Sequence, residues 1–158
     1  IIAFRVCDEV SRPGDAITVC NEARTGLFED DPKLLSSLAN AQFAAGQYRA
    51  TIETLDRLRA ANPSFRSPDG HLIYARALEE SGETSRAIEE YASLSRYYPG
   101  VEARVREALL HKKLGRTDEA AAMLDAILKD ARLAPKHFQR SQREWIEMAK
   151  RERANESA

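Results

Sequence analysis

The chain repeats itself at a fixed spacing, and this repeat restricts its fold more than any other feature. Three residue types recur 36 positions apart, in the pairs Gly46 and Gly82, Ile52 and Ile88, and Pro63 and Pro99. A further copy carries its glycine at Gly115, and a partial copy begins at Gly14. Units of this period bury their apolar faces only by stacking on one another. We therefore expect a stack of similar units.

Each unit is expected to contain two helices joined at its glycine. Apolar residues recur at helical spacing around Gly46, in the sets Leu35, Leu38 and Ala39, and Ile52, Leu55 and Leu58. Aromatic residues make up only 7% of the chain, whereas Ala, Leu, Glu and Arg, all strong helix formers, are abundant. A compact β protein needs more β-branched and aromatic residues, so the sequence predicts an all-α fold.

Local start and stop signals agree with these helices. Asp31-Pro32 and Ser67-Pro68 each place an N-cap residue before a proline in the first helical turn. The repeated glycines stand where a left-handed residue ends one helix and begins a tight turn. The second helices are predicted to run to the stop signals Asn62-Pro63 and Tyr98-Pro99-Gly100.

The pattern of large and small residues resembles the tetratricopeptide repeat. The residues that carry the resemblance are Leu38, Ala39, Gly46, Tyr48, Leu55 and Pro63; then Tyr74, Ala75, Gly82, Ala87, Tyr91 and Pro99; and then Ala108, Gly115, Ala120 and Leu124. The resemblance implies a right-handed superhelical solenoid of antiparallel helix pairs. Three residues depart from the family pattern. Thr51 replaces an alanine, Glu107 a large apolar residue and Arg132 the closing proline.

We expect one solenoid domain over residues 1–158. Its parts are an incomplete first repeat (1–30), three repeats (32–65, 68–100 and 101–134) and a C-terminal capping helix (135–153). The cap places Phe138, Trp145 and Met148 on one face, as expected of a helix that covers the apolar end of a solenoid.

Three further segments, residues 27–32, 59–72 and 140–146, look like those of a group of bacterial repeat proteins of unknown activity. In that group the repeats follow a short N-terminal membrane anchor. The resemblance implies a bacterial origin. We expect a cytoplasmic location, or a membrane-tethered one if an anchor precedes Ile1. No apolar run in the chain is long enough to span a bilayer.

The leading functional hypothesis is a protein-interaction scaffold that binds a peptide or helix of a partner. The family resemblance implies that the first helix of each repeat lines a concave groove. Apolar anchors and charged groups at groove-facing places suit a docked peptide. The residues predicted to bind the partner are Lys33, Ser36, Asn40, Phe43, Leu72, Arg76, Glu79, Val105, Leu109 and Lys112.

Some relatives clamp the C-terminal carboxylate of heat-shock chaperones with two lysines, two asparagines and an arginine. Only Asn40 and Arg106 match that set here, and Glu102 would repel a carboxylate. The sequence therefore argues against chaperone-tail binding.

Two alternatives stay open. The first is self-assembly through the uncapped N-terminal end, with apolar side chains from Ile1, Ile2, Phe4, Val6 and Val10. The second is nucleic-acid binding through the basic side chains of the cap, Lys136, Arg140, Arg143, Lys150, Arg151 and Arg153. Snorkelling side chains explain those cations more simply, and a formal net charge of −1 shows no excess for neutralising phosphates.

Nothing in the sequence predicts an enzyme, a cofactor or a metal site. His71, His111 and His137 fall on separate helices without a cysteine or histidine at ligand spacing. The chain has no glycine-rich phosphate loop and no nucleophile elbow. Cys7 and Cys20 fall on packed helix faces, so we expect reduced, buried thiols, with a bridge between neighbouring helices as the alternative.

Overall fold

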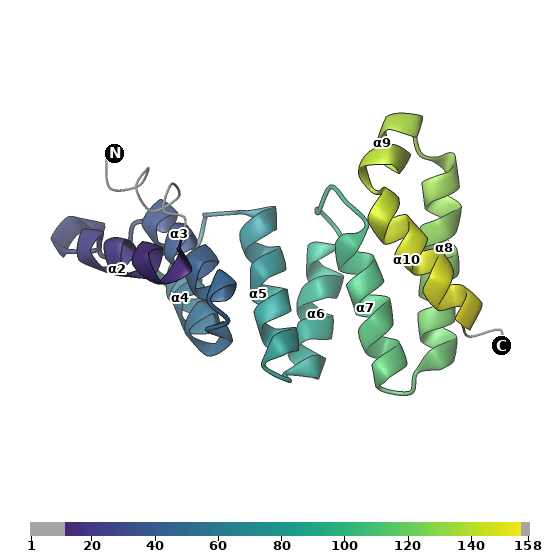
Figure 1. Ribbon diagram of the computed structural model, residues 1–158, viewed down its shortest axis with the longest axis horizontal. Helices are drawn as coiled ribbons and strands as arrows, with labels where there is room; N and C mark the ends of the chain where they lie inside the picture. Colours follow the sequence, from purple (N-terminus) through teal and green to yellow (C-terminus); the bar gives the residue numbers. More distant parts are fainter. Residues whose placement is uncertain (1–11, 156–158) are drawn as a thin grey trace. The chain divides into compact units, whose positions relative to one another are not determined.

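The computed structural model describes residues 12–155, in which all regular structure is helical (Figure 1). The prediction of an all-α fold is confirmed for these residues. The chain divides into two compact units, residues 1–83 and 84–158, and each is described by itself. The boundary falls between the two helices of the repeat predicted at 68–100.

The first unit contains four described α-helices and a short 3-10 helix. These are α2 (Pro13–Ala23), the 3-10 helix Gly26–Phe28, α3 (Pro32–Ala44), α4 (Tyr48–Ala61) and α5 (Pro68–Glu80). Helix α3 packs against α2, α4 and α5, and α4 also packs against α5. Cys20 on α2 forms an apolar cluster with Leu34 and Leu38 on α3.

The predicted caps and turns are confirmed. The Asp31 Oδ1 atom accepts hydrogen bonds from the backbone N–H groups of Lys33 and Leu34, both at 3.0 Å. Ser67 Oγ accepts one from the Gly70 N–H at 3.0 Å. Gly46 has a φ of 73°, and the Gln47 N–H bonds back to the Gln42 carbonyl at 2.8 Å. A left-handed glycine thus reverses the chain between α3 and α4.

The structure explains the departure at Thr51. Its side chain is fully buried on α4, where a hydroxyl needs a partner. Thr51 Oγ1 donates to the carbonyl of Gln47, the N-cap residue of this helix, 2.9 Å away. A threonine therefore fits where the family pattern has alanine.

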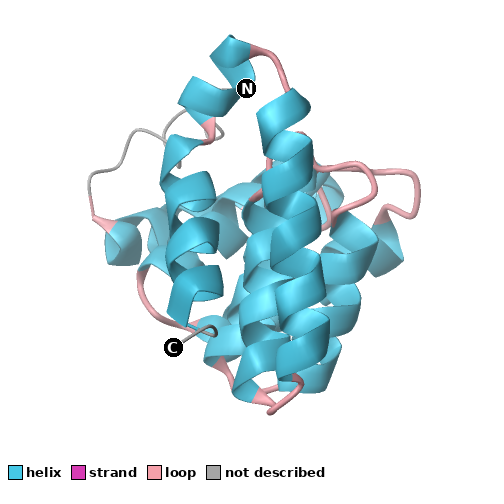
Figure 2. Ribbon diagram, turned by 90° about the vertical axis from the view of Figure 1, so that its right-hand side faces the viewer, coloured by secondary structure: helices cyan, strands magenta, loops and turns pink. Residues whose placement is uncertain are grey.

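Five helices lie in the second unit between residues 84 and 155. These are α6 (Thr84–Leu94), α7 (Glu102–Lys113), α8 (Thr117–Leu133), α9 (Lys136–Ser141) and α10 (Arg143–Asn155). Helix α7 packs against α6 and α8, and α10 packs against both α7 and α8. Figure 2 looks onto this unit, with α10 ending at the label C. The main cluster includes Val105, Leu124, Ile127 and Ala149, with Phe138, Trp145 and Met148 packed against it.

Two helix boundaries differ from the prediction. The capping helix expected over 135–153 is two helices with a break at Gln142, whose φ is −102° and ψ 12°. The Gln142 Oε1 atom accepts a hydrogen bond from the Val101 N–H at 3.1 Å, so a distant contact holds the break. Helix α6 ends at Leu94, before the predicted stop signal at Tyr98. The Leu94 carbonyl accepts hydrogen bonds from the N–H groups of Tyr97 and Tyr98.

Some predictions concern residues outside the described range. Cys7 and the N-terminal apolar residues Ile1, Ile2, Phe4, Val6 and Val10 lie there, so a Cys7–Cys20 bridge and self-assembly through that end stay predictions. None of the helices between residues 12 and 155 combines the length and the apolar character that crossing a membrane needs.

Candidate protein-binding surface

The predicted partner-binding residues lie on three helices. In the first unit, α3 carries Lys33, Ser36, Asn40 and Phe43, and α5 carries Leu72, Arg76 and Glu79. In the second unit, α7 carries Val105, Leu109 and Lys112. Since the two units are separate bodies, each group is considered within its own unit.

In the first unit the structure brings Phe43 and Arg76 together. The guanidinium carbon of Arg76 lies 4.7 Å from the centre of the Phe43 ring, within the range of a cation–π interaction. The ring of Tyr48, the first residue of α4, meets Phe43 edge to face, with 5.4 Å between ring centres. All three side chains are partly exposed. We call Phe43, Tyr48 and Arg76 the Phe43 cluster.

Local sequence explains how the Phe43 cluster forms. Phe43 is in the last turn of α3, and the turn at Gly46 returns the chain so that Tyr48 comes back beside it. Arg76 is supplied by α5, which packs against α3. Ala39 and Ala75 are both fully buried, and small side chains at such positions let neighbouring helices approach closely. Sequence reasoning gave Tyr48 only a structural role, although its place directly after the turn was the available signal.

The other predicted residues of this unit differ in how far their side chains are exposed to solvent. Lys33 and Asn40 are exposed on α3, and Glu79 is partly exposed on α5. The Ser36 Oγ atom is buried without a hydrogen-bond partner among the described residues, so it presents little to a partner. Leu72 is a core residue with 8% of its surface exposed, because it lies on the same helix stripe as the buried Ala75 and Leu78. We correct its assignment from surface anchor to core.

In the second unit, the predicted α7 residues are engaged by the protein itself. Val105 is fully buried in the core cluster with Ala108 of the same helix and Val101, the N-cap residue of α7, so it is not a surface anchor. Leu109 packs against the same cluster. The Lys112 Nζ atom lies 3.0 Å from Glu152 Oε2 on α10, and it also donates to the Glu152 carbonyl at 3.3 Å.

A second cation–aromatic contact joins α7 to α10. The Arg106 guanidinium lies 4.9 Å from the centre of the Trp145 ring, and its Nε bonds to Glu102 Oε1 at 2.8 Å. Together with the Lys112–Glu152 ion pair, this contact fixes α10 against α7. In this unit the C-terminal helix therefore covers the part of α7 that was predicted to meet a partner.

One acidic side chain of this unit, Glu107, has a shifted pKa. Burial raises the pKa of Glu107 on α7 above its ordinary value, and the positive charge of Arg104 only partly opposes that effect. Glu107 departs from the family pattern, which has a large apolar residue at this position, so a carboxyl group is partly removed from water there. In the first unit, hydrogen bonds to Glu29 and Asp30 raise the pKa of the exposed Arg57.

Within residues 12–155, no three side chains of His, Cys, Asp or Glu gather in a way that could hold a metal ion. His111 Nδ1 lies 3.0 Å from Glu119 Oε2, which is an ion pair only when the imidazole is protonated.

Two family models match the chain, and both are described as tetratricopeptide repeat. They cover residues 43–110 and 102–131, which together make up more than half of the chain. The chain belongs to the tetratricopeptide repeat family. Tetratricopeptide repeats generally mediate protein–protein interaction, and the family is typically a non-catalytic scaffold. No curated protein matches the chain. The bacterial origin and the membrane anchor implied by the second resemblance stay predictions.

Proposed function

We propose that this tetratricopeptide repeat protein is a non-catalytic scaffold that binds a peptide or helix of a partner protein on the α3–α5 face of its first unit. The observation that carries the proposal is the Phe43 cluster, in which a cation and two aromatic rings from three helices meet while staying partly exposed. Aromatic and arginine side chains supply a large share of binding energy at protein interfaces.

The neighbouring side chains supply polar contacts. Asn40 lies one helical turn before Phe43 on α3, and its amide offers both donors and an acceptor. Arg76 supplies a guanidinium that can bond to a partner carboxylate while its flat face stays on the Phe43 ring. Glu79 is one turn further along α5. The face therefore combines an aromatic centre with charges of both signs, which suits a mixed, amphipathic segment.

Leu72 and Val105 are not part of the proposed surface because both are buried, and Lys112 is held by α10. The proposal thus rests on the first unit alone. Self-assembly through the N-terminal residues is not developed further, since those residues lie outside the described range.

A selection from a random displayed peptide library tests the proposal. Peptides should be enriched on the parent protein and lost from the Phe43→Ala, Arg76→Glu double variant. Arg49→Glu is the matched control, because it reverses an exposed charge on α4 of the same unit outside the Phe43 cluster. Equal enrichment on the parent and the double variant, or none on the parent, would contradict the proposed surface.

A further inference from the structure

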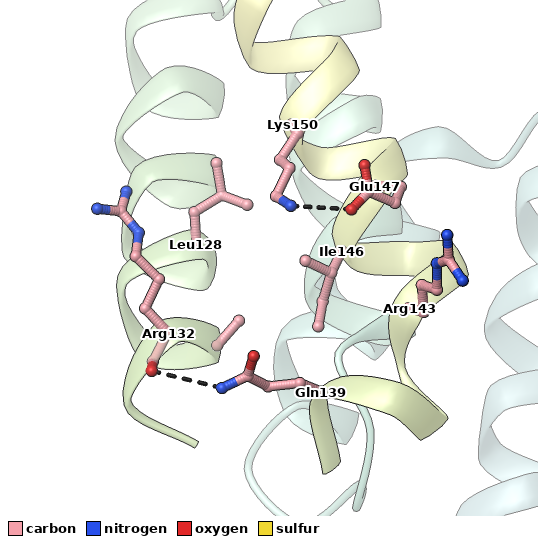
Figure 3. Close-up of a pocket in the computed structure, with 8 residues that line it drawn as sticks. Leu128, Arg132, Gln139, Arg143, Ile146, Glu147 and Lys150 are labelled. Atoms are coloured by element: carbon pink, nitrogen blue, oxygen red, sulfur yellow. Dashed lines mark hydrogen bonds and ion pairs between the residues drawn. The ribbon is translucent and has the colours of Figure 1, made fainter. Parts of the chain in front are cut away.

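A pocket of about 180 Å³ lies between α8, α9 and α10 in the second unit (Figure 3). Its apolar walls come from Leu128 and Ala131 on α8 and from Ile146 on α10. Figure 3 shows Leu128 and Ile146 facing the space between the two helices. Gln139 of α9 bounds one end, where its Nε2 donates to the Ala134 carbonyl at 2.8 Å.

Charged side chains surround this apolar space unevenly. Arg132, Arg143 and Lys150 line it together with a single carboxylate, Glu147. Lys150 Nζ lies 2.8 Å from Glu147 Oε1, so that pair neutralises itself and the two arginines leave an excess of positive charge. The hydrogen bond from Lys150 lowers the pKa of Glu147, and the charges of Arg143 and Arg151 add to the effect. In Figure 3 the two guanidinium groups flank the space and point outward.

The size of the pocket limits what it holds. A cavity of about 150 Å³ accommodates a benzene-sized group, whereas sites that enclose small-molecule ligands usually measure about 300–1,000 Å³. A volume of about 180 Å³ therefore suits one leucine or phenylalanine side chain. Arg132 and Arg143 would then lie on either side of the inserted side chain. Its neighbours in an extended peptide would pass beside these two arginines.

We propose that this pocket binds an acidic segment of a partner protein, which inserts one apolar side chain between Leu128 and Ile146 and places carboxylates against Arg132 and Arg143. The pocket is a second site, on helices other than those of the Phe43 cluster. Charge complementarity is the argument for the occupant, since a carboxylate gains charge-assisted, bidentate hydrogen bonds from an arginine.

The lining residues favour an acidic peptide over a polynucleotide. Single-stranded nucleic acid gains much of its affinity from bases that stack on aromatic rings. None of the eight residues that line the pocket is aromatic. The cap cations predicted for nucleic acid are also partly engaged, since Arg153 Nε lies 2.9 Å from Asp125 Oδ1 and Lys150 is paired with Glu147.

A short fluorescent peptide provides the probe, with acidic residues on both sides of a central leucine. Its anisotropy is followed as the protein is titrated in. Two control peptides replace the leucine with alanine or the acids with their amides. We expect saturable binding of the probe and roughly tenfold weaker binding to Arg132→Glu, Arg143→Glu. The matched control is Lys129→Glu, Lys136→Glu, which reverses two exposed charges on α8 and α9 outside the pocket.

A variant that binds the probe more tightly than the parent gives a further test, because a misfolded protein would lose affinity. Glu147→Gln removes the one carboxylate of the lining and should tighten binding by roughly threefold. Glu144→Gln removes an exposed carboxylate of α10 that does not line the pocket and should leave the affinity unchanged.

Four results would each overturn the inference. One is no binding of the probe up to millimolar concentration. Another is equal binding of the alanine or amide peptide. A third is displacement of the probe by single-stranded RNA or by anionic vesicles, together with equal binding of the leucine peptide and the alanine peptide. The last is a concentration-dependent dimer lost in Arg132→Glu, Arg143→Glu, which would make a second copy the occupant. Variants at Phe43 and Arg76 should bind the probe normally, so failure here is distinct from failure of the α3–α5 surface.

Discussion

The guanidinium of Arg76 on α5 lies 4.7 Å from the centre of the Phe43 ring on α3. Two residues 33 positions apart in the sequence thus meet on the same face of the first unit. Because neither side chain is fully buried, the contact is available both to the fold and to a partner. The two roles are separable by experiment.

The structural role predicts a measurable coupling. Arg76→Ala and Phe43→Ala should each lower the free energy of unfolding modestly, and the double variant should lose less than the sum. We expect a coupling energy of about 0.5–1 kcal/mol, because the site is partly exposed to water. Urea unfolding of the four proteins measures it. Strict additivity would show that the cation–ring contact contributes nothing to stability.

Two buried threonines of α4 should respond differently to the same substitution. Thr54 Oγ1 bonds to Gln42 Oε1 at 2.8 Å across two helices, and both residues are buried. Thr54→Val leaves that amide oxygen without its partner, so we expect a loss of about 1–2 kcal/mol. Thr51→Val should change stability by less than about 0.5 kcal/mol, because the Gln47 carbonyl keeps its bond from the Thr51 N–H. Equal losses in denaturant unfolding would contradict this assignment.

Much of the fold followed from local signals in the sequence. Asp31, Ser67 and the repeated glycines act on their own neighbours, so their roles were predictable from spacing alone. The helix break at Gln142 was not predictable in this way, because no glycine or proline marks it. A hydrogen bond from the Val101 N–H, 41 positions away, holds the break. A side chain added at Gly100 would come within 2.6 Å of Gln142 Oε1, so this glycine permits the approach.

The candidate site was less predictable, for geometric reasons. One position along a helix turns the side chain by about 100°, so Leu72 and Val105 fell on the core stripe instead of the surface. Lys112 was predicted to meet a partner, but its ion pair with Glu152 depends on where α10 packs. The pocket had no local signal, because its walls meet only where α10 packs against α8.

The turn glycines make a sharp prediction about backbone conformation. A Cβ added to Gly46 or to Gly14 meets nothing within 4 Å, so crowding is absent at both. Only Gly46 has a left-handed φ, where an L-residue is disfavoured by roughly 1–2 kcal/mol. Gly46→Ala should therefore destabilise, whereas Gly14→Ala at the start of α2 should stabilise by roughly 0.5 kcal/mol. Thermal unfolding that moves both variants in one direction would refute this.

The raised pKa of Glu107 predicts a stability that depends on pH. Well below the ordinary value of 4.5 the carboxyl is protonated in both states and has no effect. As the pH rises through that value, the unfolded chain loses the proton first, so stability falls until the raised folded pKa is passed. At pH 7, Glu107→Gln should be about 0.5 kcal/mol more stable than the parent, since solvent screens part of the charge.

Urea unfolding of Glu107→Gln at neutral and at acidic pH checks this sign. The advantage of the variant should shrink as the pH falls below 4.5. Glu144→Gln removes an exposed charge from α10 of the same unit and serves as the control. A Glu107→Gln advantage that grew in acid would mean that the carboxyl is stabilised, rather than disfavoured, in its charged form.

The most direct test of the central claim is the affinity of a selected peptide for the parent protein and its variants, measured by isothermal titration calorimetry. We predict that Phe43→Ala and Arg76→Glu each weaken binding by roughly tenfold or more, as expected for residues at the centre of an interface. Arg49→Glu, which reverses a charge outside the Phe43 cluster, should bind like the parent. Unchanged affinity in both Phe43→Ala and Arg76→Glu, with the fold intact, would show that the α3–α5 face is not the partner-binding surface.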